Sequence, residues 1–184
     1  MKRMLSQFHV QLVPVGTVSP AILEFLALTL PDTLGVLCRI RNSHVDVSKA
    51  YSTARQQYNS TEILAQLVNL NGNERTKILG VTDVDLFIPI LTFVFGEAQL
   101  GRQAALISVH RLHQQFYGLP EDEELFFERC EKEALHELGH AFGLVHCRDF
   151  ECVMHFSNSI EQVDLKSNAF CSLCADFLSQ AMRA

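Results

Sequence analysis

The sequence lacks a long uninterrupted apolar run and an excess of positive charge. Its longest apolar stretch, 86–95, is interrupted by Pro89 and Thr92 and is too short to cross a bilayer. The first nine residues contain no apolar region of the kind found in a secretory signal. The formal net charge of −6 argues against a nucleic-acid-binding surface. These absences predict a soluble, cytoplasmic protein that binds neither membranes nor nucleic acid, and we expect it to be a monomer.

The chain has the size and composition of one folded domain. It contains 184 residues, 48% of them apolar, with 13 phenylalanines. A chain of this length can bury a sizeable core, and this composition excludes a disordered protein.

Five segments have the alternating or continuous apolar character of β-strands. Segment 78–87 is dominated by apolar residues and predicts a central strand. Asp83 and Asp85, near its end, are interpreted as hydrogen-bonding residues rather than metal ligands. The polar, aperiodic segment 51–59 predicts a long surface loop. The predicted strands are 5–15, 35–47, 78–87, 92–98 and 104–112.

Capping residues and prolines mark the predicted helix boundaries. Ser19-Pro20 opens a first helix that Pro31-Asp32 ends. A second helix runs from Ser60 to Leu70 and is ended by Asn71-Gly72. Pro120 lies in the first turn of a long, largely buried helix whose acidic residues favour the positive helix end. A short terminal helix is expected to pack inward through Leu173, Phe177, Leu178 and Met182.

The segment His136-Glu-Leu-Gly-His-Ala-Phe-Gly-Leu-Val-His146 contains the strongest chemical pattern. Residues of an α-helix advance by about 100° each, so His136 and His140 share one face and can bind one metal ion. Glu137 lies beside that face, where a general base can contact a metal-activated water. Gly143 lets the chain leave the helix in a left-handed conformation and return His146 as a third ligand. Three histidines leave the fourth position of zinc open, as in catalytic sites.

Four of the six cysteines form two close pairs, Cys147 with Cys152 and Cys171 with Cys174. Two short pairs separated by a loop are typical of a closed four-thiolate zinc site. Free thiols and two disulfides are the alternatives, and a reducing compartment favours metal over disulfides. A structural zinc there would hold a tail too short to build its own core. The remaining two, Cys38 and Cys130, are expected to have no chemical role.

The extended histidine motif, followed by a methionine two residues past a cysteine and by a cysteine-rich tail, resembles the archaemetzincins. These are a branch of the metzincin metallopeptidases. The resemblance implies that Glu137 is the general base and that Met154 is the Met-turn methionine beneath the metal. It implies a catalytic zinc on His136, His140 and His146. It also implies a second, structural zinc on Cys147, Cys152, Cys171 and Cys174.

The resemblance further implies an α+β, metzincin-like fold. Its sheet is mostly parallel and twisted, has an antiparallel edge strand, and packs against long helices. The whole chain, 1–184, is then one metallopeptidase domain. It divides into an upper subdomain at about 1–143 and a small, zinc-held lower subdomain at about 144–184. An extended peptide or protein substrate would pair with the edge strand near 95–98. Glu97 on this strand is interpreted as a solvated edge charge.

The predicted activity is hydrolysis of peptide bonds by a zinc-bound water, with Glu137 as its base. An aminopeptidase acting on short peptides is an alternative, for which Glu97 is a weak candidate to anchor the α-amine. A catalytically latent zinc-binding protein is another, which the presence of Glu137 disfavours because metal binding alone does not require it. No motif selects an oxyanion-stabilising residue from the three tyrosines, Tyr51, Tyr58 and Tyr117. His155, beside Met154, is at most a neighbour of the site.

Overall fold

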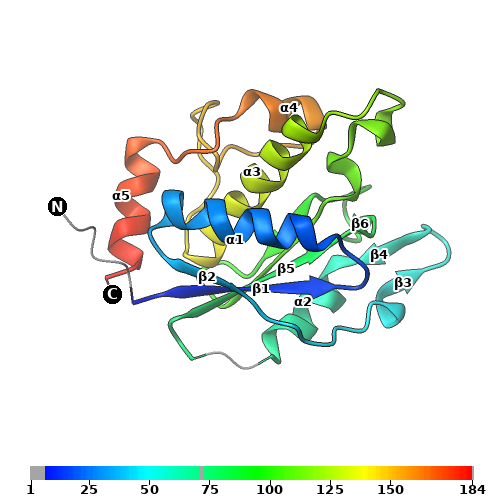
Figure 1. Ribbon diagram of the computed structural model, residues 1–184, viewed down its shortest axis with the longest axis horizontal. Coiled ribbons are helices and arrows are strands. Elements are labelled where there is room, and N and C mark those ends of the chain that lie inside the picture. The colour runs from blue at the N-terminus through cyan, green and yellow to red at the C-terminus, as the bar shows by residue number, and fades with distance from the viewer. Residues whose placement is uncertain (1–6, 71–72, 184) are drawn as a thin grey trace.

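A five-stranded sheet forms the centre of the molecule (Figure 1). The computed structural model describes residues 7–70 and 73–183. All neighbouring strands are parallel except the last pair, which is antiparallel. The predicted mostly parallel sheet with an antiparallel edge strand is therefore confirmed. In spatial order the strands are β2 (Leu37–Ile40), β1 (His9–Val15), β5 (Thr76–Thr82), β8 (Ala104–Ser108) and β7 (Gly96–Ala98).

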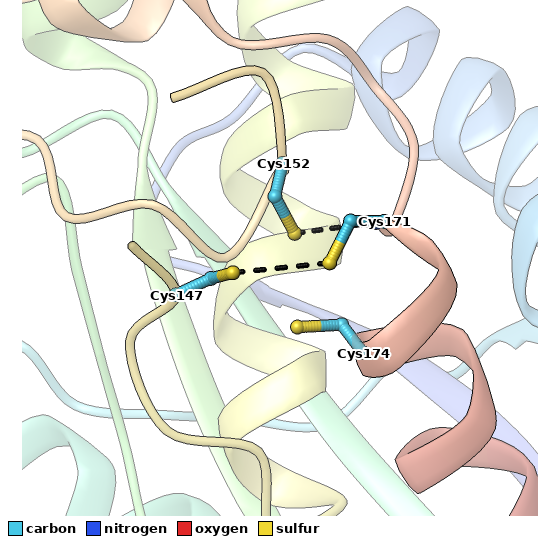
Figure 2. A group of neighbouring side chains, drawn as sticks. All are labelled: Cys147, Cys152, Cys171 and Cys174. Atoms are coloured by element: carbon cyan, nitrogen blue, oxygen red, sulfur yellow. Dashed lines mark hydrogen bonds between the residues drawn. The ribbon is translucent and has the colours of Figure 1, made fainter. Parts of the chain in front are cut away.

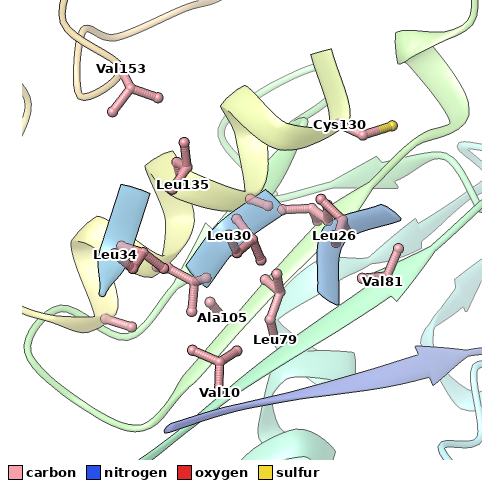
Figure 3. Close-up of a cluster of buried hydrophobic side chains, with 14 of the residues drawn as sticks. Val10, Leu26, Leu30, Leu34, Leu79, Val81, Ala105, Cys130, Leu135 and Val153 are labelled. Carbon is pink, nitrogen blue, oxygen red and sulfur yellow. The ribbon is translucent and has the colours of Figure 1, made fainter. Parts of the chain in front are cut away.

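Helices cover both faces of this sheet (Figure 1). Helices α1 (Pro20–Leu34) and α3 (Glu123–Ala141) pack on one face, and α2 (Ser60–Val68) packs on the other. Side chains of a strand point alternately to the two faces, so each strand supplies both cores. Figure 3 shows the larger core, in which Leu30 of α1 and Leu135 of α3 lie over Leu79 of β5.

The remaining elements are short. Helices α4 (Ile160–Leu165) and α5 (Ser172–Ala181) belong to the C-terminal segment, and α4 packs against α3. Within the described residues, no helix is both long and apolar enough to cross a membrane. A second, three-stranded sheet consists of β3 (Tyr51–Ser52), β4 (Gln57–Asn59) and β6 (Leu86–Phe87). Three 3₁₀-helices are η1 (Ser48–Ala50), η2 (His110–Leu112) and η3 (Gln114–Tyr117).

Two helix boundaries differ from the sequence prediction. Helix α1 continues through Pro31 to Leu34, and Gly35 ends it in the left-handed conformation at φ +68°. Pro31 removes one helical hydrogen bond, but Leu30 and Leu34 are both buried in the core, and their packing outweighs that loss. Helix α3 begins after Pro120, because the Asp122 carboxylate accepts a hydrogen bond from the Leu125 N–H and caps it.

The predicted surface loop at 51–59 is wrong, because β3 and β4 pair antiparallel there and β4 pairs with β6. Four predicted strands are also too long. Strand 78–87 divides into β5 and β6 at a turn where Arg111 binds the Asp85 carboxylate through two nitrogens. Strands 35–47, 92–98 and 104–112 shorten to β2, β7 and β8. Residues 5–6 of the first predicted strand and Asn71-Gly72 lie outside the described residues.

The terminal helix α5 exposes part of the apolar surface that was expected to face inward. Leu178 is buried and Met182 is half-buried, but Leu173 and Phe177 are 68% and 62% exposed. The inward prediction is wrong for these two. The buried stripe contains Cys174 and Leu178, which are four residues apart. Leu173 and Phe177 each precede one of them by a single residue, so they lie about 100° away on the outward side.

Candidate active site and four-cysteine cluster

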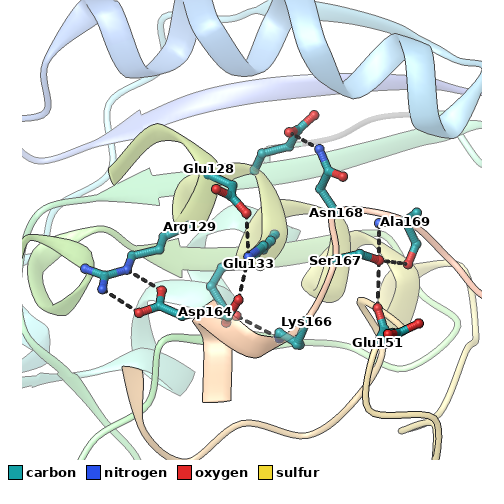
Figure 4. Close-up of polar contacts among 11 residues, drawn as sticks. Glu128, Arg129, Glu133, Glu151, Asp164, Lys166, Ser167, Asn168 and Ala169 are labelled. Carbon is teal, nitrogen blue, oxygen red and sulfur yellow. Dashed lines mark hydrogen bonds and ion pairs between the residues drawn. The ribbon is translucent and has the colours of Figure 1, made fainter. Parts of the chain in front are cut away.

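Helix α3 is buried on all sides over the turns that precede and contain the first histidine. Every residue from 129 to 139 is buried, charged residues included. Those charges pair with the C-terminal segment (Figure 4). Arg129 forms a two-nitrogen ion pair with Asp164, and Lys166 bonds Glu133 at 3.0 Å. Because an unpaired buried charge is strongly unfavourable, these pairs fix the rotation of α3 and so the direction of its histidines.

The three predicted histidine ligands come together in the structure. The ring Nδ1 of His136 lies 2.8 Å from the Val153 carbonyl oxygen, and that of His140 lies 2.7 Å from the Leu144 carbonyl oxygen. Each Nδ1 must therefore carry the proton and donate it. The two Nε2 lone pairs then face each other 3.1 Å apart. With His146, the three ligand atoms lie within 4.8 Å of one another.

This geometry fits a zinc ion. Tetrahedral ligands at about 2.0–2.1 Å place two nitrogens roughly 3.3 Å apart, close to the observed separation. Burial lowers the pKa of His136 well below its usual range, and it also lowers the pKa values of His140 and His146. All three imidazoles are therefore neutral near pH 7, which is the protonation state that binds metal.

Glu137 lies in the same cavity, against the edge strand β7. Burial raises the pKa of its carboxyl well above the usual range; the Glu133 charge adds to this shift and the Lys166 charge opposes it. A cation bound at the histidines favours the carboxylate form. Gly96 of β7 permits the close packing, because a Cβ there would lie 2.7 Å from Glu137 Oε1. The Glu137 side chain is thus held between α3, which bears it, and strand β7.

Glu97 is not the solvated edge charge that was predicted. It is half-buried, and its carboxylate accepts hydrogen bonds from the Ser60 hydroxyl at 2.5 Å and the Thr61 hydroxyl at 3.0 Å. Both hydroxyls belong to the first turn of α2, where partial positive charge favours a carboxylate. Sequence spacing gave no sign of this pairing, because the partners are far apart in the chain.

Met154 is fully buried beneath the helix that bears the histidines. A Cβ at Gly139 would overlap the Met154 sulfur and lie 3.3 Å from the Phe170 ring. Gly143, just past the helix, has φ +99° and lets the chain turn toward His146. His155 lies apart from the other histidines, because its Nδ1 bonds the Cys147 carbonyl oxygen at 3.0 Å.

A cavity of about 300 Å³ connects these groups. Its upper wall is the segment leading into β7 together with the strand itself. Its lower wall follows the Met154 turn and includes Ser157 and Lys166. None of the three tyrosines, all of which the structure describes, lines it. The cavity is bounded by His136, Glu137, His140 and His146 on one side and by 92–98 on the other.

The two cysteine pairs also come together (Figure 2). Their sulfurs lie within 4.8 Å of one another, with Cys147 and Cys171 at 3.8 Å, and no disulfide joins the cysteines. Four thiolates at about 2.3 Å from zinc place their sulfurs roughly 3.8 Å apart, so the cluster fits this metal. Burial raises the pKa of the Cys152 thiol, and the Cys171 N–H, which donates to the Cys152 sulfur at 3.4 Å, opposes that shift. A hydrogen bond from the Cys174 backbone lowers the pKa of Cys171.

Cys38 and Cys130 lie outside this cluster. Burial raises the pKa of the Cys38 thiol to about 12 and also raises that of Cys130, so both are unreactive thiols near pH 7. Asp85 pairs with Arg111, and Asp83 lies 3.6 Å from His110. Both aspartates therefore interact with neighbouring side chains, as predicted.

Four residues of the site were missed by the sequence analysis. Gly139 lies inside a helix, where glycine is unfavourable, and this was a usable signal of close packing. Gly96 gave the same signal inside a predicted strand. Ser157 and Lys166 gave none, because their places in the cavity wall depend on tertiary contacts alone.

Comparisons with known proteins agree with this geometry. Residues 23–180 match the model of peptidase family M54. The chain is 45% identical over 162 residues to the archaemetzincin of Methanocaldococcus jannaschii, covering 88% of this chain and 87% of that one. It is 42% identical to the archaemetzincin of Pyrococcus furiosus, covering 92% of each. The crystal structure of the Methanopyrus kandleri archaemetzincin superposes with a TM-score of 0.85 at 36% identity, covering 96% of each chain.

A histidine-bearing helix below an antiparallel edge strand, shared with these relatives, is the architecture of a zinc metallopeptidase, and that is the class of this protein. Within the class, the chain belongs to peptidase family M54 together with the archaemetzincins. The resemblance seen in the motif is thereby confirmed.

Proposed function

We propose that His136, His140 and His146 bind the catalytic zinc and that Glu137 is the general base of peptide-bond hydrolysis. The observation that supports this most directly is the close approach of the His136 and His140 Nε2 atoms. The Nδ1 atom of each ring is held by a backbone carbonyl oxygen. When bound, the metal supplies Lewis-acid activation of water and of the peptide carbonyl. The Glu137 carboxylate accepts the proton of the attacking water and passes it to the leaving amine.

The substrate is an extended segment of a peptide or protein that pairs with β7. This strand forms the free edge of the five-stranded sheet and lines the cavity. Such an edge offers backbone N–H and C=O groups to an incoming chain. Gly96 keeps this edge close to Glu137, so a paired backbone passes directly over the catalytic groups.

We further propose a second, structural zinc on Cys147, Cys152, Cys171 and Cys174, giving two zinc ions per chain. Four thiolates leave no open position, so this metal takes no part in hydrolysis. Cys147 follows His146 directly, and its N–H donates to the Met154 carbonyl at 2.9 Å. The cluster therefore holds together the lower subdomain, about 144–184, which is distinct from the upper subdomain, about 1–143. We also propose that the protein acts in the reducing cytoplasm, where clustered cysteines bind metal rather than form disulfides.

The test is cleavage of a diverse peptide mixture by the zinc-loaded protein beside Glu137→Ala, with products identified by mass spectrometry. We expect internal cuts that disappear in the variant while its zinc content stays unchanged. Equal products from the two proteins, or loss of zinc from the variant, would contradict the assignment of Glu137. Glu24→Ala, at an exposed carboxylate outside the cavity, is the matched control.

An aminopeptidase is the second candidate. The Glu97 carboxylate lines the same cavity and is held in place by two hydroxyls, as an anchor for an α-amine requires. Sequential loss of residues from the amino end, abolished by Glu97→Gln, would favour this reading. Internal cuts that persist in Glu97→Gln would exclude it.

A further inference from the structure

One part of the cavity wall takes no role in the reaction described above. Lys166 and Glu133 both line the cavity, although their side chains are only 1% and 4% exposed. The Lys166 ammonium bonds Glu133 Oε1 at 3.0 Å (Figure 4). It also reaches the His155 carbonyl oxygen at 3.5 Å. An ammonium has three N–H donors, and the described residues offer this one only two acceptors.

Ser157 lies in the same wall, and its hydroxyl group also has fewer hydrogen-bond partners than it can bind. Ser157 is one of the residues that line the cavity. Its hydroxyl oxygen is buried behind that wall and has no hydrogen-bond partner in the part of the chain that the structure describes. A buried polar atom without a hydrogen-bond partner is unfavourable, so such atoms are uncommon unless a ligand or water supplies the partner. Lys166 and Ser157 are thus two donors with unused capacity at one wall.

The neighbouring ion pairs lie outside the cavity wall, which argues against a purely structural role for Lys166. The Arg129 guanidinium bonds both Asp164 oxygens and the Leu112 carbonyl oxygen. Lys132 bonds Glu128 and the Asp164 carbonyl oxygen. These pairs join the same two segments of the chain, but none of their residues lines the cavity. Fastening α3 to the C-terminal segment therefore does not require a lysine in the cavity wall.

We propose that Lys166 and Ser157 form a carboxylate-binding subsite of the substrate cleft. A carboxylate accepts hydrogen bonds from both an ammonium and a hydroxyl, and it supplies the negative charge that a cationic group favours. A basic substrate group would meet the Lys166 ammonium at this wall, where the Glu133 carboxylate is already bonded to that ammonium. The bound carboxylate comes either from an acidic side chain next to the scissile bond or from the carboxyl terminus of a short peptide.

The place of this subsite relative to the reaction agrees with the proposal. Glu133, the partner of Lys166, precedes Glu137 by four residues on α3, which is a rise of about 6 Å along the helix. Neighbouring residues of an extended peptide are about 3.3 Å apart. A side chain one or two residues from the scissile bond therefore reaches Lys166 while the bond itself lies at Glu137. The inference rests on the proposed peptidase function.

Peptide binding to a catalytically inactive variant tests the carboxylate subsite separately from the proposed peptidase function. Zinc-loaded Glu137→Ala is titrated calorimetrically with peptides that differ only in Glu or Gln at one position. A second set compares free and amidated carboxyl termini. We expect tighter binding, by roughly 10-fold or more, of the peptide with the carboxylate, since one charge-assisted hydrogen bond contributes about this much. The first set reports an acidic side chain and the second reports a terminal carboxylate.

Three further variants in the same background complete the test. Lys166→Met should remove the preference and Ser157→Ala should reduce it several-fold. Lys49→Met, at an exposed lysine that does not line the cavity, should retain it. Ser157→Ala deletes only a hydroxyl without a partner, so it remains informative even if Lys166→Met does not fold. Equal affinity for the carboxylate and amide peptides in both sets would overturn the subsite. A preference for the carboxylate in a protein whose wild type cleaves no peptide would uphold the subsite and overturn the proposed function instead.

Discussion

The Glu137 carboxylate lies directly against the α-carbon of Gly96 on the edge strand. A Cβ at position 96 would lie 2.6 Å from Glu137 Cγ and 2.7 Å from the Leu106 backbone oxygen. The strand backbone cannot yield, because β7 is hydrogen-bonded to β8. The edge strand therefore sets the position of the general base from above, as α3 does from below.

Gly96→Ala should displace the Glu137 carboxylate and leave the zinc ligands in place. We expect kcat to fall by roughly 100-fold, since a misplacement of about 1 Å has this effect on catalysis. Steady-state kinetics and metal analysis on the same sample check this. An unchanged kcat would show that the Glu137 position is not critical, and loss of zinc would show that Gly96 acts on the histidines instead.

Gly139→Ala should lower the free energy of unfolding by about 1–3 kcal/mol through overpacking against Met154. Alanine normally favours a helix by up to about 1 kcal/mol over glycine, so a decrease opposes the intrinsic trend. Denaturant unfolding of the zinc-loaded protein measures it.

The control for this prediction is a double-mutant cycle with Met154→Ala. Removing the methionine side chain makes room for the new methyl group, so the two changes should be strongly non-additive. If the two losses in the free energy of unfolding were additive, the strain caused by Gly139→Ala would not come from contact with Met154.

Cys171→Ser should release one zinc ion per chain and lower the free energy of unfolding by about 3 kcal/mol or more, because metal binding contributes directly to folding. Metal analysis and thermal unfolding measure the two effects. Cys38→Ser is the matched control, since Cys38 lies outside the cluster, and it should keep both metals. An unchanged zinc content in Cys171→Ser would contradict the four-cysteine site.

The contact between His110 and Asp83 predicts a small pH dependence of stability. The Asp83 carboxylate raises the pKa of His110 above its usual range. The stabilisation is therefore complete below about pH 6.5, the unfolded value, and is lost as the pH rises through the folded pKa. Both groups are partly exposed, so screening limits the effect to about 1 kcal/mol or less. The unfolding temperature of Asp83→Asn should fall below that of the wild type at about pH 6, and this difference should shrink toward pH 8. A difference that does not change with pH would contradict the role of His110.

Local spacing explains what the sequence made predictable. The relation of His136, Glu137 and His140 follows from one helical turn, and Gly143 and His146 follow within a few residues. The two cysteine pairs are equally local. The alternation in β1 and the apolar run of β5 likewise depend on neighbouring residues.

The features that could not be predicted depend on residues distant in the chain. Pro31 stays inside α1 because the core surrounds the helix, and periodicity does not report that contact. Glu97 is a half-buried hydrogen-bond acceptor because α2 brings Ser60 and Thr61 beside it. Lys166 reaches the cavity from a segment with no motif. Each outcome is decided by a tertiary partner.

The burial of α3 on all sides determines how the protein exchanges its amide protons. Residues 129–139 have no solvent-facing side and are packed between the sheet core and the C-terminal segment. Their backbone amides should exchange only through global unfolding, whereas fraying of the chain ends leaves them protected. His136 and His140 then move apart only when the whole molecule opens. His146, which is exposed and lies beyond the helix, can move without the unfolding of α3, so we expect a metal ion bound at the proposed site to enter and leave from its side.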